Sequence, residues 1–106
     1  MAKVDVSVVN GAIKVDPETL AMGGRGHNAT IEWKLNTTGW TFPSDGIVID
    51  DNHGQFKHLR PIDKGLKFQC TDTNDDSGRY KYTVKVTDGK TTLELDPIIQ
   101  NGDGTT

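Results

Sequence analysis

The sequence predicts an all-β domain built as an antiparallel sandwich. Residues that favour strands, mainly valine, isoleucine and threonine, are frequent, and 12 glycines supply turns. Apolar and polar residues alternate with a period of two in several segments, which is typical of strands with one buried face. Two pairs, Asn10-Gly11 and Asp88-Gly89, lie between such segments and indicate β-hairpins. We expect one domain over residues 1–100 and a flexible tail over 101–106.

The alternation locates the strands in chain order. The alternating or continuously apolar segments are residues 4–8, 31–35, 47–49, 66–70 and 80–86. Asp16-Pro17-Glu18 is typical of a helix start, although Gly23-Gly24 limits such a helix to one short turn. We expect residues 50–65 to be mostly loop, with a short edge strand near Phe56.

The Asp88-Gly89 pair predicts a two-residue turn, because both central positions of a type I′ turn need positive φ. This turn would place the apolar residues of both strands on one face. The predicted pairs are Val84 with Leu93, Tyr82 with Leu95 and Tyr80 with Pro97.

The Asn10-Gly11 pair predicts a second hairpin in the same way. Its register sets Val8 against Ile13 and Val6 against Val15. The same register sets Asp5 against Asp16, and like charges in opposite positions are unfavourable. We therefore expect this pairing to fray or bulge before it reaches the two aspartates.

Charge and cysteine content exclude several classes of protein. Twelve lysines and arginines face 15 aspartates and glutamates, giving a net charge of −3, which argues against nucleic acid as a partner. No apolar run approaches the roughly 18 residues of a membrane span, so a membrane is not an expected partner either. The lone Cys70 suits a reducing compartment, and the first residues lack the apolar stretch of a secretory signal. We expect a cytoplasmic protein.

The run Asp76-Ser77-Gly78-Arg79-Tyr80 resembles the D-x-G-x-Y signature of immunoglobulin-like sandwiches. That resemblance implies about seven strands and a tyrosine corner, in which the Tyr80 hydroxyl bonds nearby backbone. Trp33 resembles the core tryptophan of strand C, and Tyr82 stands where the family has its second cysteine. The inter-sheet disulfide of antibody domains is therefore absent.

The whole chain resembles the DP-EP family, small uncharacterised bacterial sandwich proteins. The residues that carry this resemblance are Val15-Asp16-Pro17-Glu18-Thr19-Leu20, Ile31-Glu32-Trp33, Phe42-Pro43-Ser44-Asp45-Gly46-Ile47 and Leu95-Asp96-Pro97. The resemblance implies a sandwich fold and supplies no activity.

Residues 17–20 and 29–33 also resemble the opening of a cupredoxin. A blue-copper site needs two histidines, a cysteine and usually a methionine in a fixed order. No histidine follows Cys70 in the sequence, so the expectation is a copper-free relative of that sandwich at most.

Three oxygen-bearing residues at alternate positions, Asp72, Asn74 and Asp76, are candidate ligands for a weak calcium site, because hard cations prefer such ligands. The EF-hand pattern fails, since its glycine would fall at Ser77 and its closing glutamate at Thr83. The favoured interpretation is a polar loop that leads into the tyrosine corner. We expect no cofactor and no tightly bound metal.

The remaining candidates are histidines, a thiol and two aromatic residues. His27, His53 and His58 are scattered and lack the paired spacing of a zinc site, so we expect surface histidines. Cys70 follows the inward phase of its strand, which predicts a buried and inert thiol. Trp40 and Phe42 are candidate ligand-contacting residues, with closure of the core as the favoured role.

These observations predict a non-catalytic binding or assembly module rather than an enzyme. The expected partner is an unidentified protein or a second copy of the chain, which would give a homo-oligomer. The alternative is a domain that binds an ion or small ligand through the acidic loops together with Trp40.

Overall fold

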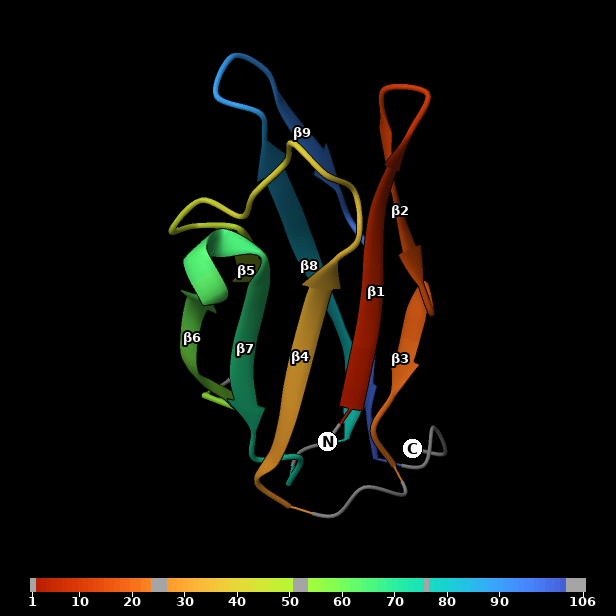
Figure 1. Cartoon of the computed structure of the whole chain (residues 1–106). Helices are drawn as coiled ribbons and strands as arrows, with labels where there is room; N and C mark the ends of the chain where they lie inside the picture. Colours follow the sequence, from red (N-terminus) through yellow and green to blue (C-terminus); the bar gives the residue numbers. More distant parts are fainter. Residues whose placement is uncertain (1, 24–26, 51–53, 76, 103–106) are drawn as a thin grey trace.

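The computed structural model describes residues 2–23, 27–50, 54–75 and 77–102, which form a β-sandwich of two packed sheets (Figure 1). The predicted all-β sandwich is confirmed, with ten strands among these residues instead of about seven. The strands are β1 (Ala2–Val9), β2 (Ala12–Asp16), β3 (Thr19–Ala21), β4 (Ala29–Leu35), β5 (Ile47–Ile49), β6 (Phe56–Ile62), β7 (Lys67–Asp72), β8 (Gly78–Thr87), β9 (Thr92–Leu95) and β10 (Ile98–Asn101). A 3-10 turn, η1 (Asp63–Gly65), precedes β7.

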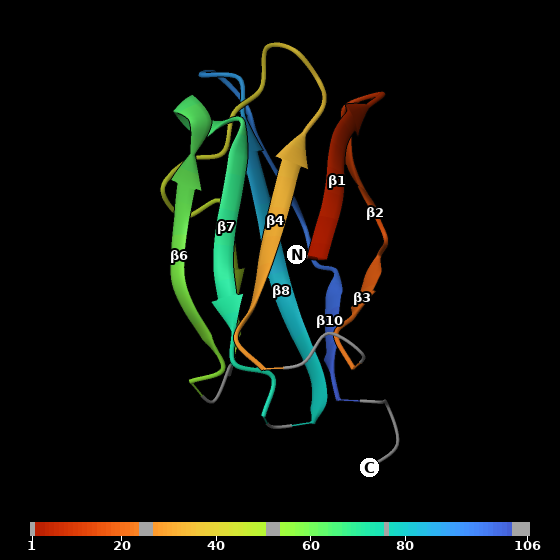
Figure 2. The ribbon, with the colours of Figure 1, turned by 60° about the horizontal axis from the view of Figure 1, so that its bottom comes forward.

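One sheet has the order β2-β1-β4-β7-β6 and the other β3-β10-β8-β5, with β9 also paired to β8. Both sheets are mixed, because β1 pairs with β4 and β3 with β10 in parallel. The segment from β2 to β3 pairs with β1 in the first sheet and then with β10 in the second (Figure 2). The structure thus departs from the purely antiparallel sandwich that the sequence predicted.

The core is packed between the sheets from the apolar phase of each strand. Its centre is aromatic: Trp33 lies with its ring centroid 5.5 Å from that of Tyr82 and 6.5 Å from that of Phe68. The predicted equivalence of Trp33 with the strand C tryptophan is wrong. In immunoglobulin domains strand C adjoins strand F, whereas β4 lies in the sheet opposite β8, which pairs with β5, β9 and β10.

The Asn10-Gly11 hairpin has the predicted register, and both turn residues have positive φ. The expected fraying before the aspartates is wrong, since pairing continues to Asp5 opposite Asp16. Asn36, which follows β4, donates a hydrogen bond of 3.2 Å from its Nδ2 to Asp5 Oδ1. This bond offsets part of the repulsion between the two carboxylates.

The Asp88-Gly89 hairpin has the predicted face but the wrong register. Val84 lies opposite Leu95 and Val86 opposite Leu93, a shift of two residues, so the loop has four residues rather than two. The side chain of Asp88 explains the longer loop: its Oδ1 accepts the backbone N–H groups of Lys90 at 2.9 Å and Thr91 at 2.7 Å. Because side chains alternate with a period of two, a two-residue shift keeps the apolar face.

Three further expectations are corrected. The segment after Asp16 forms β3 instead of a helical turn, because Leu20 is buried and pairs with Ile99 of β10 in the second sheet. Residues 56–62 form a full edge strand, β6, in place of a mostly irregular loop. Asn101, which the sequence assigned to the tail, ends β10 and is fully buried, while residues 103–106 lie outside the described part.

Candidate functional site

Polar residues connect several loops at one end of the sandwich, shown at the bottom of Figure 1. We call this region the loop end and define it as residues 22–23, 27–28, 54–55, 72–75 and 101–102. These residues follow β3, precede β4 and β6, and include the last residues of β7 and β10 with those directly after them. The hub of the loop end is the segment after β7, residues 73–75, whose hydrogen bonds reach the segments after β3, before β4, before β6 and after β10.

Asn74 ties the loop end to the second sheet. Its Nδ2 donates to the backbone oxygen of Met22 at 2.8 Å, and its Oδ1 accepts the backbone N–H of Gly102 at 3.1 Å. Asn74 has a φ of 53°, a conformation that asparagine adopts more readily than most residues. Gly102 has a φ of 73° and lies directly against Ser77, so the space at this position requires glycine.

Gln55 ties the same hub to the segment before β6. Its Oε1 accepts both the Thr73 hydroxyl and the backbone N–H of Asp75, each at 3.0 Å. The backbone oxygen of Thr73 in turn accepts the N–H of Asn28 at 3.2 Å, and His27 Nδ1 lies 3.2 Å from the same oxygen. Gln55 is buried, so this network has both an interior and a solvated part.

Two acids in this region have opposite electrostatic environments. Burial raises the pKa of Asp72, although its Oδ1 accepts the side chain of Asn101 at 3.0 Å and the N–H of Asn74 at 2.9 Å. Hydrogen bonding to Gln55, and then to the Thr73 hydroxyl, lowers the pKa of the exposed Asp75. The loop end thus presents an ionised carboxylate to solvent above a buried polar pair.

The candidate calcium ligands have structural partners. Asp72 and Asn74 lie together, but Asp72 Oδ1 and Asn74 Oδ1 accept N–H groups of the protein, and Asp76 lies outside the described residues. Within the part of the chain that the structure describes, no three His, Cys, Asp or Glu side chains are grouped to hold a metal.

Cys70 is buried at the centre of β7, as predicted, and burial raises its pKa to about 12. A thiol in this state is neither a nucleophile nor a metal ligand at neutral pH. His27 belongs to the loop end, His58 is exposed on β6, and His53 lies outside the described residues.

The two candidate aromatic residues lie at the end opposite the loop end. Thr41, between them, pairs with Thr87 at the far end of β8, whereas Gly78 at the near end pairs with Asn101 (Figure 1). Phe42 is buried in an edge-to-face contact with Phe68, with ring centroids 5.9 Å apart, and half-buried Trp40 packs on the core. The structure therefore does not bring Trp40 next to the acidic loops.

Sequence reasoning missed Gln55, Met22 and Asn101. Gln55 fell in a presumed loop, Met22 contributes a backbone oxygen, and Asn101 was placed in the tail. One signal in the sequence could have indicated these residues: an amide side chain next to a glycine at the boundary of an apolar segment. Gly54-Gln55 and Asn101-Gly102 both have this pattern.

Comparison with known protein families gives no match for this chain, and a search of curated proteins finds no match either. In the part of the chain that the structure describes, no helix has the length and apolarity needed to cross a membrane.

Proposed function

We propose that this domain is a non-catalytic binding module and that the loop end is its recognition surface. The observation that carries the proposal is the network through Asn74, Thr73 and Gln55, which joins residues 73–74 to three other segments by hydrogen bonds of 2.8 to 3.1 Å. A polar surface that is already ordered loses little conformational entropy on binding. Loops held on a rigid sandwich are also the usual place for binding residues.

The exposed charge suggests the chemistry of the partner. Asp75 is an exposed acid within this network and is held in its ionised form, and Asp50, directly after β5, is a second exposed acid. A polar partner that carries a lysine or arginine side chain complements this surface. A divalent cation is the alternative ligand, because the same carboxylates are oxygen donors.

The open edge of the first sheet favours this surface over strand-to-strand assembly. β6 carries a bulge between Lys57 and Arg60, and His58 within it has a φ of 59°. Arg60 Nη1 donates to the backbone oxygen of His58 at 2.9 Å, and Pro61 lacks an N–H. Charges, proline and bulges at an edge oppose pairing with another chain.

The buried thiol supports a role without catalysis, since Cys70 is held neutral inside the core. Membership of the DP-EP family, an immunoglobulin-like ancestry and a cytoplasmic location stay part of the proposal. The sandwich fold is compatible with each of them, and also with a copper-free cupredoxin-like domain.

Titration of the ¹⁵N-labelled protein tests the proposal. The probes are short peptides that carry lysine or arginine, with calcium chloride and magnesium chloride in separate titrations. We expect the peptides to shift amide signals of residues 22–23, 27–28, 54–55, 73–75 and 101–102. Shifts caused by calcium alone would favour the ion-binding alternative, and peptide shifts confined to a sheet face would contradict the proposal.

A pair of variants sharpens this experiment. Asn74→Ala removes the ties to Met22 and Gly102 and should weaken peptide binding. Asn36→Ala is the matched control, because Asn36 also bonds through its side-chain amide but lies after β4, at the opposite end. Equal effects of the two variants would count against the loop end.

A further inference from the structure

We propose that Asp72 and Asn101 form a buried proton-binding site, in which one proton on Asp72 Oδ2 is shared with Asn101 Oδ1. The site joins the end of β7 in one sheet to the end of β10 in the other. It is the buried part of the loop end but does not depend on the proposed binding function.

The number of donors and acceptors carries the inference. Asp72 and Asn101 are both 0% exposed. Asp72 Oδ1 accepts the Asn101 amide and the N–H of Asn74, while Asp72 Oδ2 and Asn101 Oδ1 have no hydrogen-bond partner among the described residues. A buried polar atom without a partner costs about 1–3 kcal/mol.

One added proton satisfies both unpaired oxygens. The ionised carboxylate and the carboxamide together have three acceptor oxygens and a single donor group, the Asn101 NH₂. Rotating the Asn101 carboxamide by half a turn, which exchanges its oxygen and its nitrogen, leaves this number of donors and acceptors unchanged. A carboxylic acid has an O–H donor, so the protonated pair gains a second hydrogen bond, from Asp72 Oδ2 to Asn101 Oδ1, beside the existing bond of 3.0 Å.

The surroundings favour the neutral form of Asp72. Burial raises its pKa, and the negative charge of Asp75 acts in the same direction. The strands paired with β7 place uncharged residues opposite it, Ala29 on β4 and Phe56 on β6. The charged and titratable side chains on β4, β6, β7 and β8 and in the adjoining loops form a longer set. They are Glu32 and Lys34 on β4, Lys57, His58 and Arg60 on β6, Lys67 and Cys70 on β7, Arg79, Tyr80, Lys81, Tyr82 and Lys85 on β8, and His27 and Asp75 in the loops.

Carbon-detected NMR of the Asp72 side-chain carboxyl tests the site in the unmodified protein. We expect this carboxyl to titrate above the ordinary aspartate value of 3.8. Titration at or below that value would overturn the proposal. Asp72 would then be ionised near neutral pH, with a bound water or cation as the partner of its Oδ2. A rise in melting temperature with millimolar calcium, together with such a low value, would identify the cation.

The variant Asp72→Asn provides a second measurement. Its amide reproduces the donor of the protonated acid, so it should fold and be as stable as the parent or more so near pH 7. Because the folded parent binds the proton more tightly than the unfolded chain, its stability should fall as pH rises through the native pKa of Asp72. This fall should be missing in Asp72→Asn and present in Asp50→Asn, which changes an exposed aspartate. An unchanged fall in Asp72→Asn would overturn the proposal, and if that variant does not fold, the carboxyl titration decides alone.

Discussion

Trp33 and Tyr82 join the two sheets by a polar contact inside an apolar core. Trp33 Nε1 donates a hydrogen bond of 3.0 Å to the Tyr82 hydroxyl, and both residues are fully buried. They lie on β4 and β8, so the bond crosses the sandwich. Removal of the acceptor leaves an indole N–H without a partner in a dry environment, which is costly.

We predict that Tyr82→Phe lowers the free energy of unfolding by about 1–3 kcal/mol, the usual cost of a buried donor without a partner. Urea denaturation measures this change. The double variant Trp33→Phe/Tyr82→Phe is the control, and it should cost less than the sum of the two single changes because it removes both partners. A Tyr82→Phe protein as stable as the parent would show that the bond does not contribute.

Burial also predicts how stability responds to alkaline pH. The pKa values of Cys70 and Tyr82 are each raised to about 12. The unfolded chain loses these protons first, so the folded state is the one that holds more protons, and stability should fall as pH rises above about 9. At about pH 8 the native Cys70 should react slowly with a thiol-specific disulfide reagent, and quickly in denaturant. Rapid labelling of the native protein would contradict this account.

The tyrosine corner stays a prediction. Tyr80 is buried and packs edge-to-face on Phe56, with ring centroids 5.2 Å apart. If its hydroxyl bonds nearby backbone, Tyr80→Phe should lower the free energy of unfolding by about 1 kcal/mol or more. Equal stability of the variant and the parent in urea would remove the corner argument.

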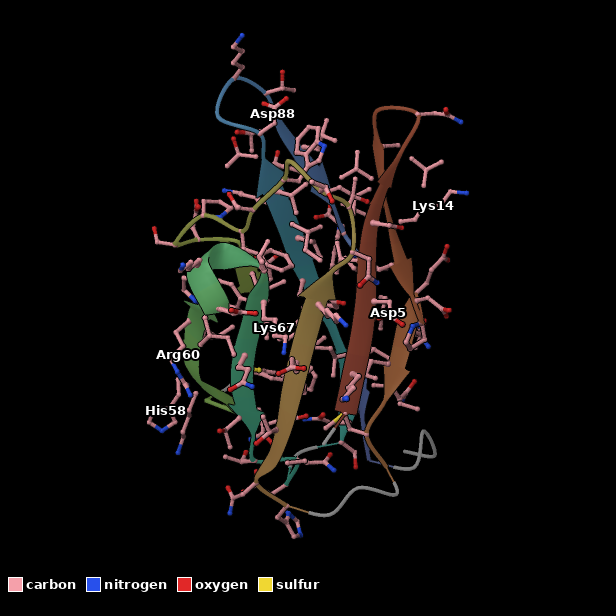
Figure 3. All side chains as sticks on the ribbon, viewed as in Figure 1. Asp5, Lys14, His58, Arg60, Lys67 and Asp88 are labelled. Carbon is pink, nitrogen blue, oxygen red and sulfur yellow. The ribbon has the colours of Figure 1, made fainter. Side chains whose placement is uncertain are left out.

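At the scale of elements, the β8–β9 hairpin depends on one exposed side chain. Asp88 lies at the end of this hairpin (Figure 3), and two backbone N–H groups that bond to it lower the pKa of its carboxyl. We predict that Asp88→Ala lowers the melting temperature at neutral pH, whereas Asp88→Asn, which keeps an acceptor oxygen, has a smaller effect. Because the folded pKa is depressed, this contribution is present above the ordinary aspartate pKa and is lost as pH falls through the native value. A difference between parent and Asp88→Ala that persists in strong acid would contradict this account.

The edge strand β6 yields a prediction about assembly. Lys57 and Arg60 are exposed on this strand, and Arg60 points away from the sheet in Figure 3. We expect Lys57→Val/Arg60→Val to self-associate in sedimentation experiments, because it removes the charges that protect the edge. The control variant Lys3→Val/Lys34→Val also replaces two cationic side chains by valine, but on β1 and β4, which lie inside the sheet. This control should self-associate less than the edge variant. Equal association would mean that hydrophobicity alone, and not the edge, is responsible.

The elements also show what a sequence can and cannot predict. The Asn10-Gly11 register follows from local chemistry, since both turn residues supply the positive φ that the turn needs. The β8–β9 register depends on the Asp88 side chain competing for backbone N–H groups, which the Asp-Gly pair alone does not reveal. The parallel partners of β1 and β3 are distant in sequence, so no local pattern selects them.

At the scale of the whole molecule, the same limit applies to the loop end. The polar character of residues 72–76 is visible in the sequence, but Asn74 finds its partners at Met22 and Gly102, far away along the chain. The sandwich brings these residues together by aligning the ends of β3, β7 and β10. The loop end is therefore ordered before any partner arrives.

Amide hydrogen exchange of the free protein tests this claim most directly. The N–H groups of Thr73, Asn74 and Gly102 donate to Gln55 O, Asp72 Oδ1 and Asn74 Oδ1 at 2.8, 2.9 and 3.1 Å. We predict that they exchange about a hundredfold or more slowly than in an unstructured peptide. Gly102 should lose this protection in Asn74→Ala but keep it in Asn36→Ala. Exchange of all three amides at the unstructured rate in the parent protein would contradict an ordered recognition surface.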